Sequence, residues 1–241
     1  INVSEALRDS CNYYFYEVGY RLATNNYSTA YNDSLGIEKL QKYASLFGLN
    51  ERTGIEIEEA APQIANEFPV MAAIGQSNNN YTTVQLARYV TAVANEGTVY
   101  QYTLLNRLED SDGNVLQTFE PQVRNQIDVL DTEEWNAIHS GMRMVVENTK
   151  EFDGFPIEAA GKTGTAQQNL KRPNHALFVG YAPYDDPEIS IATRIAYGYT
   201  SHNAAKLARN VFAYYFNVEN EDELLNGQAA NGNSSSNEIS D

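Results

Sequence analysis

The chain has 241 residues and a mass of 26.9 kDa, a size that suits one large domain or two small ones. Thirty-two Asp and Glu residues outnumber sixteen Lys and Arg residues, and the net charge of −16 argues against a protein that binds nucleic acid or an anionic membrane through a basic face. No apolar run reaches the roughly 18 residues of a membrane-spanning helix. The single cysteine, Cys11, excludes an internal disulfide and a cysteine-rich zinc site.

Acidic and small polar residues dominate the C-terminal end of the chain. No basic residue follows Arg209, whereas six Asp and Glu residues do, and residues 226–237 are all Asn, Gly, Ser, Ala or Gln. We therefore predict a body over residues 1–217, which carries the function, and an acidic, disordered tail over residues 218–241. The chain starts at Ile1 without a visible signal peptide, and we interpret it as a piece of a longer protein.

The first half of the chain shows the apolar spacing of three amphipathic helices, followed by a hairpin. The predicted helices span residues 12–23, 36–47 and 82–96. Gly48 offers a natural end for the second helix, and Thr82 with Gln85 forms a capping-box pattern at the start of the third. Residues 103–119 then predict two strands that turn at Asp112-Gly113.

The second half predicts a sheet between two further helices. A helix over residues 131–148 carries an apolar stripe that includes Trp135 and Met142. Three short strands follow, and a last helix closes the body; they span residues 157–167, 176–184, 188–197 and 203–216. Successive strands joined by short turns indicate an antiparallel sheet with helices packed on it. With the helical first half, this order predicts an α+β protein with a helical lobe.

The string from Gly161 to Thr165, with Lys162, Thr163 and Gly164 inside it, is the sharpest local motif. It can be a polar strand at a sheet edge, and it does not fit a phosphate-binding P-loop, because Pro156 stands where that loop needs its first glycine. Lys-Thr-Gly also belongs to the signature of penicillin-recognising serine enzymes. On that interpretation the lysine and the two threonines bind a substrate carboxylate, the glycine leaves room for substrate, and the Thr165 N–H contributes to an oxyanion hole.

The partner of Lys-Thr-Gly in that signature is Ser-x-Asn, which occurs four times here. The copies begin at Ser10, Ser77, Ser201 and Ser235. The last lies in the tail, the third opens a helix where a cap is expected, and the second lies in a polar loop. The first copy, Ser10-Cys11-Asn12, lies at a junction between two helical segments, where Ser10 can relay a proton and Asn12 can hold a lysine and the substrate amide. A helix cap by Ser10 or Asn12 is the competing interpretation.

Five blocks of sequence resemble the transpeptidase domain of penicillin-binding proteins, in order and spacing, through residues 1–216. They read SEALRDSCNYYFYEVGYRLA, LGIEKLQKYASLFGLNERTGIEI, AAIGQSNNNYTTVQLARYVTAVANEGTVY, AAGKTGTAQ and HALFVGYAPYDDPEISIAT. The resemblance is to the monofunctional class B type. It implies a penicillin-binding, serine β-lactamase-like fold that is incomplete at its N-terminus. It also implies that Ser10 and Asn12 form the second motif of the family, that Lys162, Thr163 and Gly164 form the third, and that Thr165 serves the oxyanion hole.

The chain departs from the family at the first motif, Ser-x-x-Lys, which supplies the nucleophile and its base. None of the six lysines follows a serine by three positions. A covalent serine mechanism needs both groups within hydrogen-bond reach. We expect the motif on an N-terminal remainder of the same protein, upstream of Ile1. The alternatives are a catalytically inactive relative that acts as a β-lactam sensor or scaffold, and a module that binds cell-wall peptides.

The resemblance implies a D,D-transpeptidase that crosslinks peptidoglycan stem peptides ending in D-Ala-D-Ala and that β-lactam antibiotics acylate. It implies neither a metal nor an organic cofactor and no nucleic-acid partner. It places the site at the extracytoplasmic face of the cell membrane, with an anchoring N-terminal helix outside this chain. The three widely spaced histidines, which we interpret as surface or structural residues, are His139, His175 and His202.

Overall fold

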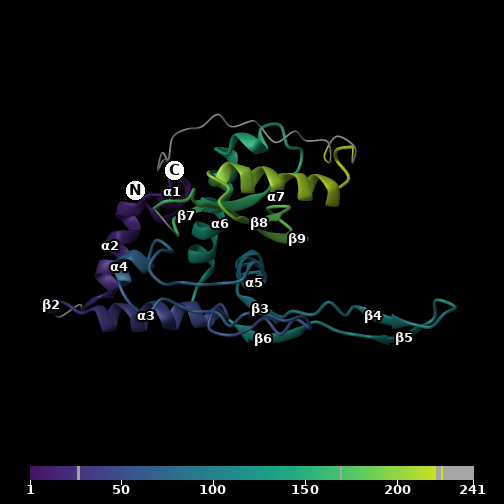
Figure 1. Cartoon of the computed structure of the whole chain (residues 1–241), viewed down its shortest axis with the longest axis horizontal. Helices are drawn as coiled ribbons and strands as arrows, with labels where there is room; N and C mark the ends of the chain where they lie inside the picture. Colours follow the sequence, from purple (N-terminus) through teal and green to yellow (C-terminus); the bar gives the residue numbers. More distant parts are fainter. Residues whose placement is uncertain (26–27, 169, 221–223, 225–241) are drawn as a thin grey trace. The chain divides into compact units, whose positions relative to one another are not determined.

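A computed structural model describes residues 1–25, 28–168, 170–220 and 224 (Figure 1). The chain divides into two compact units. One unit combines Ile1–Cys11 with the chain from Glu133 onward, and the other is Asn12–Thr132. The second unit is therefore inserted, in sequence, between the first helix of the chain and the rest of the first unit.

Within its described residues, unit Asn12–Thr132 contains four helices and three pairs of antiparallel strands. The helices are α2 (Asn12–Leu22), α3 (Asp33–Leu46), α4 (Pro69–Ala72) and α5 (Thr83–Ala94). The strand pairs are β1 (Thr24–Asn25) with β2 (Ser28–Tyr31), β3 (Thr98–Gln101) with β6 (Gln122–Gln126), and β4 (Arg107–Glu109) with β5 (Val115–Thr118). The predicted capping box is confirmed: Gln85 N donates to Thr82 Oγ1 over 3.2 Å, and Thr82 N donates to Gln85 Oε1 over 2.8 Å.

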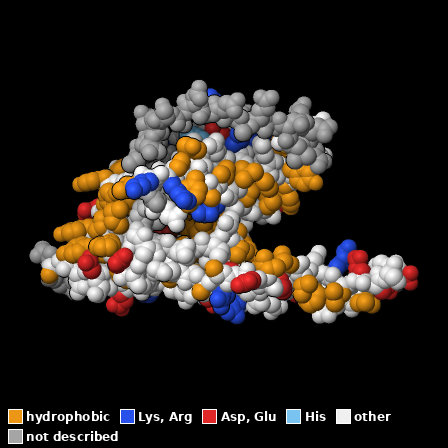
Figure 2. Space-filling view, in the orientation of Figure 1, with side chains coloured by type: hydrophobic (Ala, Val, Ile, Leu, Met, Phe, Trp, Pro, Cys, Tyr) orange, Lys and Arg blue, Asp and Glu red, His pale blue; other side chains and the backbone are white. Residues whose placement is uncertain are grey.

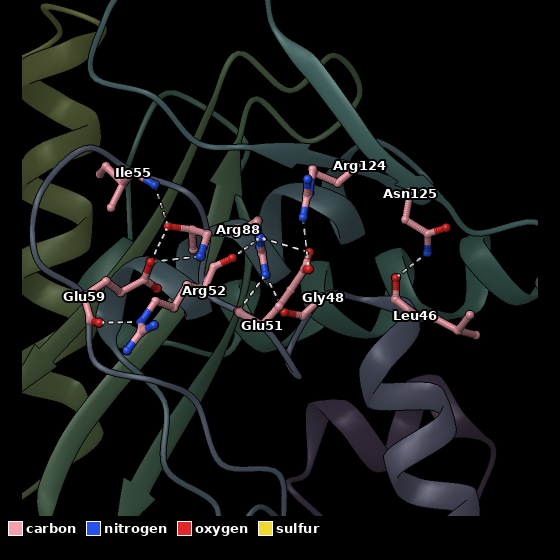
Figure 3. Close-up of polar contacts among 10 residues, drawn as sticks. Leu46, Gly48, Glu51, Arg52, Ile55, Glu59, Arg88, Arg124 and Asn125 are labelled. Atoms are coloured by element: carbon pink, nitrogen blue, oxygen red, sulfur yellow. Dashed lines mark hydrogen bonds and ion pairs between the residues drawn. The ribbon is translucent and has the colours of Figure 1, made fainter.

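A buried arginine organises the loop that follows α3 (Figure 3). The Arg88 side chain is 1% exposed. Its guanidinium donates to the backbone carbonyls of Gly48, Glu51 and Arg52. Because a buried carbonyl without a donor is costly, Arg88 stabilises a loop that is 36 to 40 positions away in the chain.

The predicted hairpin is confirmed as β4 and β5, which extend as a ribbon beyond β3 and β6 (Figure 1). Its turn is closed by the Asp110 carboxylate, which accepts from the N–H groups of Asp112 and Asn114, each over 2.9 Å. Gly113 adopts a φ of +84°, a conformation that favours glycine. Hydrophobic side chains stand beside charged ones along this ribbon (Figure 2), and the exposed apolar residues are Leu104, Leu105, Leu108, Val115 and Leu116.

The other unit packs helices against a three-stranded antiparallel sheet. Its elements are α1 (Val3–Arg8), α6 (Thr132–Glu147), the 3-10 helix η1 (Lys150–Phe152), β7 (Ala160–Ala166), β8 (His175–Ala182), β9 (Ile189–Ile195) and α7 (Ser201–Tyr215). The strand order is β7-β8-β9, so β7 lies at an edge of this sheet. Phe178 of β8 and Phe212 of α7 are fully buried in a core that the small side chains of α7 complete.

The structure confirms the α+β class, and it shifts two helix starts. Helix α3 begins at Asp33, before the predicted start, because the Asn32 side chain accepts from Leu35 N over 3.2 Å and caps it. The cap expected from Ser201 or Asn203 is wrong: Thr200 holds the cap position of α7. None of the helices in the described ranges combines the length and apolarity of a bilayer span. Of the predicted tail, residues 221–223 and 225–241 lie outside the described residues.

Candidate active site

Helix α1 and the residues after it position Ser10. The Asn2 side chain and Glu5 form a capping box at the start of α1, and the Ser4 hydroxyl donates to Ala137 O of α6 over 2.7 Å. The chain turns sharply after α1, and Ser10 adopts a φ of +47°, which is uncommon for a residue other than glycine. The predicted junction between two helices is therefore present, with a constrained serine inside it.

The structure brings Ser10 and Lys162 together across 152 positions of sequence. Lys162 Nζ donates to Ser10 Oγ over 2.5 Å and to the carbonyl of Thr163 over 3.1 Å. A hydroxyl that accepts from an ammonium keeps its own proton for a third group. The pair is thus suited to hand a proton between reacting groups, and this contact supports a site role for Ser10 over that of a helix cap.

Strand β7 presents the remaining candidates beside Lys162. In the register with β8, Thr163 lies opposite Phe178 and Thr165 lies opposite Ala176. Lys162 Nζ also lies 3.5 Å from Thr163 Oγ1, so the ammonium and this hydroxyl lie together at β7. A Cβ atom at Gly164 would meet only Leu177 Cβ, at 3.4 Å, so this position leaves space above the strand.

Asn12 lies at the start of the other unit, as the first residue of α2, and its side chain is exposed. The second Ser-x-Asn copy is built into a loop instead. Asn79 Oδ1 accepts from Ala65 N over 2.8 Å, and Asn79 Nδ2 donates to Gln76 O over 3.1 Å. In the third copy, Asn203 Nδ2 donates to Gly198 O over 2.8 Å. Asn79 and Asn203 are thus hydrogen-bonded to nearby backbone, whereas Asn12 is exposed.

The residues against which α1 packs were not identified from the sequence. Gly141 of α6 lies against Leu7 and Ser4, closer than any side chain at that position would allow. A glycine inside a strongly amphipathic helix was the available signal, because such a residue often marks a close packing contact. His175, one of the three histidines interpreted as surface or structural residues, opens β8 and is buried.

Comparisons with known proteins identify the family of the chain. Residues 1–213 match the family model of the penicillin binding protein transpeptidase domain. The chain is 31% identical over 252 residues to the peptidoglycan D,D-transpeptidase MrdA of Haemophilus influenzae, a match over 90% of this chain and 36% of that protein. It is 25% identical over 261 residues to penicillin-binding protein 2A of Bacillus subtilis, over 96% of this chain and 36% of that protein. The chain thus spans about a third of the length of these curated relatives.

Solved structures share the fold. Penicillin-binding protein 2B of Streptococcus pneumoniae superposes with a TM-score of 0.78 at 24% identity, over 91% of this chain and 39% of that one. The imipenem acyl-enzyme complex of penicillin-binding protein A from M. tuberculosis superposes with a TM-score of 0.74 at 22% identity, over 90% of this chain and 47% of that one. The chain therefore belongs to the penicillin-binding protein transpeptidase family, and its curated relatives are of the class B type that the sequence blocks indicated.

Proposed function

We propose that this chain is the C-terminal part of a peptidoglycan D,D-transpeptidase that uses a serine acyl-enzyme. The observation that carries the proposal is the contact between Lys162 and Ser10, which joins the Lys-Thr-Gly strand to the first Ser-x-Asn motif. The match of residues 1–213 to the transpeptidase family supports it. The nucleophilic serine and its lysine belong, on this proposal, to a segment upstream of Ile1.

The reaction proceeds in two acyl transfers. The upstream serine oxygen attacks the penultimate D-Ala carbonyl, a serine ester forms, and the bond to the terminal D-Ala breaks. The released amine takes a proton through Ser10, and D-Ala leaves. An amine from a neighbouring stem peptide then attacks the ester, forms the crosslink and returns the serine. A β-lactam acylates the same serine by opening its ring amide.

Each candidate residue has one task in this scheme. Ser10 passes the proton, Asn12 orients the substrate amide, and the Lys162 ammonium attracts the terminal carboxylate. Thr163 and Thr165 hydroxyls donate to that carboxylate, and Gly164 admits the peptide alongside β7. A backbone N–H of Thr165 stabilises the oxyanion, an interaction typically worth about 3–4 kcal/mol in the transition state.

The proposal places the site outside the cytoplasmic membrane, where stem peptides are crosslinked, with an anchoring segment beyond these residues. A catalytically inactive relative, which acts as a β-lactam sensor, scaffold or peptide-binding module, is the second candidate. The two candidates differ in whether the full-length protein forms a covalent adduct.

Intact mass spectrometry of the full-length protein, with and without benzylpenicillin, tests the proposal. One penicilloyl adduct, located by peptide mapping on a serine upstream of Ile1, is the expected result. An adduct within the 241 residues would identify a different nucleophile. No adduct on folded full-length protein would reject the transpeptidase and favour the inactive relative.

A further inference from the structure

His175 lies where the Lys-Thr-Gly strand ends. It is the first residue of β8, and it pairs with Ala166, the last residue of β7. Its side chain is 6% exposed. A buried histidine must satisfy both ring nitrogens, because an unpaired buried polar atom is costly. The partners of these two nitrogens therefore define what the residue does.

Both ring nitrogens of His175 have a partner from a different segment. Nδ1 lies 3.1 Å from the backbone N of Tyr197, which can only donate, so Nδ1 is an unprotonated acceptor. Nε2 lies 2.8 Å from Gln168 Oε1 and carries the proton of the neutral ring. The neutral imidazole thereby ties the chain after β7, through Gln168, to the chain after β9, through Tyr197. We call Gln168, His175 and Tyr197 the His175 clamp.

The segment that the clamp holds is conformationally constrained. Tyr197 and Tyr199 both adopt positive φ angles, of 54° and 68°, which are uncommon for aromatic residues. Such backbone persists only where its surroundings enforce it, and it concentrates at functional sites. Here Tyr199 N donates to Asn174 O over 3.2 Å, beside the bond from Tyr197 N to His175.

Two arginines flank the clamp. Arg194 of β9 places Nη2 3.4 Å from both nitrogens of the His175 ring. Arg172 donates to the Tyr197 hydroxyl over 2.9 Å, and its guanidinium lies 5.1 Å from the centre of the Tyr197 ring. Burial, and then the charge of Arg194, lower the pKa of His175. Burial and the Arg194 charge therefore favour the neutral form of His175 that the two hydrogen bonds require.

We propose that neutral His175 is a positioning residue of the transpeptidase site, because it fixes the end of β7 and thereby the stretch Thr163–Thr165. This inference rests on the proposed function. Strand β7 has a neighbour on one side in the three-stranded sheet, and its last rung pairs Ala166 with His175. Beyond this last residue pair, the hydrogen bond between His175 and Gln168 restrains the chain that follows β7. A displacement of about 1 Å in a positioning element can cost about a hundredfold in rate.

Three substitutions of His175 in the full-length protein separate the two hydrogen bonds. His175→Asn keeps an acceptor near Nδ1, His175→Gln keeps a donor near Nε2, and His175→Leu removes both. We expect the rate constant for acylation by a fluorescent penicillin to fall about tenfold or more in His175→Leu, and less in His175→Asn and His175→Gln. His202→Gln, at an exposed histidine of α7, is the matched control and should leave the rate unchanged.

Hydrogen exchange measured by mass spectrometry tests the clamp without reference to activity. The Tyr197 amide should exchange faster in His175→Gln than in His175→Asn or the wild-type protein, because only Gln removes its acceptor. Equal exchange in all three would overturn the clamp. If the three proteins show the expected differences in Tyr197 exchange but the wild-type protein never reacts with penicillin, the proposed function fails while the clamp stands. Unchanged acylation in a folded His175→Leu variant would overturn the positioning role.

The pH dependence of acylation provides a readout that a purely structural role would not move. Protonation of His175 places a hydrogen on Nδ1 against the Tyr197 N–H and breaks the clamp. Arg194→Gln removes a cation that disfavours this protonation, so the acid-side loss of acylation should move to higher pH. If acylation by Arg194→Gln is lost at the same acidic pH as acylation by the wild-type protein, the requirement for neutral His175 is contradicted.

Discussion

Gly141 of α6 and Leu7 of α1 lie in such close contact that a Cβ atom at Gly141 would be 2.8 Å from Leu7 Cδ1. The same atom would be 3.0 Å from the Cα of Ser4, so α1 rests on a position without a side chain. Ser10 follows three residues after Leu7. The seating of α1 on α6 therefore sets where the Ser10 hydroxyl meets Lys162.

Gly141→Leu should displace α1 and separate Ser10 from Lys162. Overpacking of this kind typically costs about 1–3 kcal/mol of stability. We expect a lower midpoint in urea denaturation and slower acylation by penicillin in the full-length protein. Asn136→Leu, at an exposed position of the same helix, is the control. If both variants react at the wild-type rate, α1 does not position Ser10.

Lys162→Ala should slow acylation by about 10²–10³-fold, because it removes the cation that contacts Ser10 and, on the proposed mechanism, faces the substrate carboxylate. The half-buried side chain contributes little to packing, so the melting temperature should change by only a few degrees. Lys206→Ala, at an exposed lysine of α7, is the matched control. A wild-type acylation rate in Lys162→Ala would contradict the assignment.

Asn12→Ala should lower the acylation rate, whereas Asn79→Ala should lower the stability of the protein. Asn12 is exposed, so its loss should impair acylation and leave stability nearly unchanged. Asn79 bonds Ala65 N and Gln76 O, so its loss should cost about 1–3 kcal/mol and leave acylation of the folded protein intact. Stopped-flow acylation and urea denaturation measure the two quantities. Equal acylation rates in the two variants would show that the chosen Ser-x-Asn motif is wrong.

Arg88→Met should destabilise the protein by about 3 kcal/mol or more, because it leaves the carbonyls of Gly48, Glu51 and Arg52 without their donor. Arg124→Met is the control, since Arg124 is about half exposed and pairs with Glu51 at the surface. An exposed pair of this kind contributes at most about 1 kcal/mol. Urea denaturation of both variants provides the comparison, and similar midpoints would refute the structural role of Arg88.

The ion pair between Arg209 and Glu219 should make the end of α7 sensitive to acid. The hydrogen bond from Arg209 lowers the pKa of Glu219 below its usual value of 4.5. A lowered folded-state pKa stabilises the protein above the unfolded value, and this contribution is lost as the pH falls through the folded value. The difference in melting temperature between wild type and Glu219→Gln should therefore be present at pH 7 and shrink as the pH falls below 4.5. A difference that persists in strong acid would exclude this ion pair as its source.

The elements with strong local signals could be predicted from the sequence. Short strand segments between two helices, turn residues and a capping box located β7, β8, β9 and α5 to within a few residues. The Lys-Thr-Gly motif is contiguous, so its strand could be identified directly. The pairing of Ser10 with Lys162 was different: spacing alone left four Ser-x-Asn copies, and the resemblance to a family selected one of them.

Features that depend on contacts between distant segments were not predictable in this way. Hydropathy treats Arg88 as a surface residue, yet it is buried because carbonyls about 40 positions away accept from it. Strand β3 pairs with β6, and the hairpin of β4 and β5 lies between them in the sequence. Neither β3 nor β6 has a residue pattern that identifies the other as its partner. Likewise, the role of Gly141 appears only once α1 is placed against α6.

The insertion of Asn12–Thr132 between α1 and α6 has a consequence for the order of events on the ribosome. The inserted unit is complete in sequence at residue 132, whereas its neighbour needs the 83 further residues from Glu133 to Tyr215. At about 5–20 residues per second, that interval lasts about 4 to 17 s. Ser10 is thus synthesised well before Lys162, its hydrogen-bond partner. The nascent chain can therefore fold the inserted unit before the unit that holds this pair.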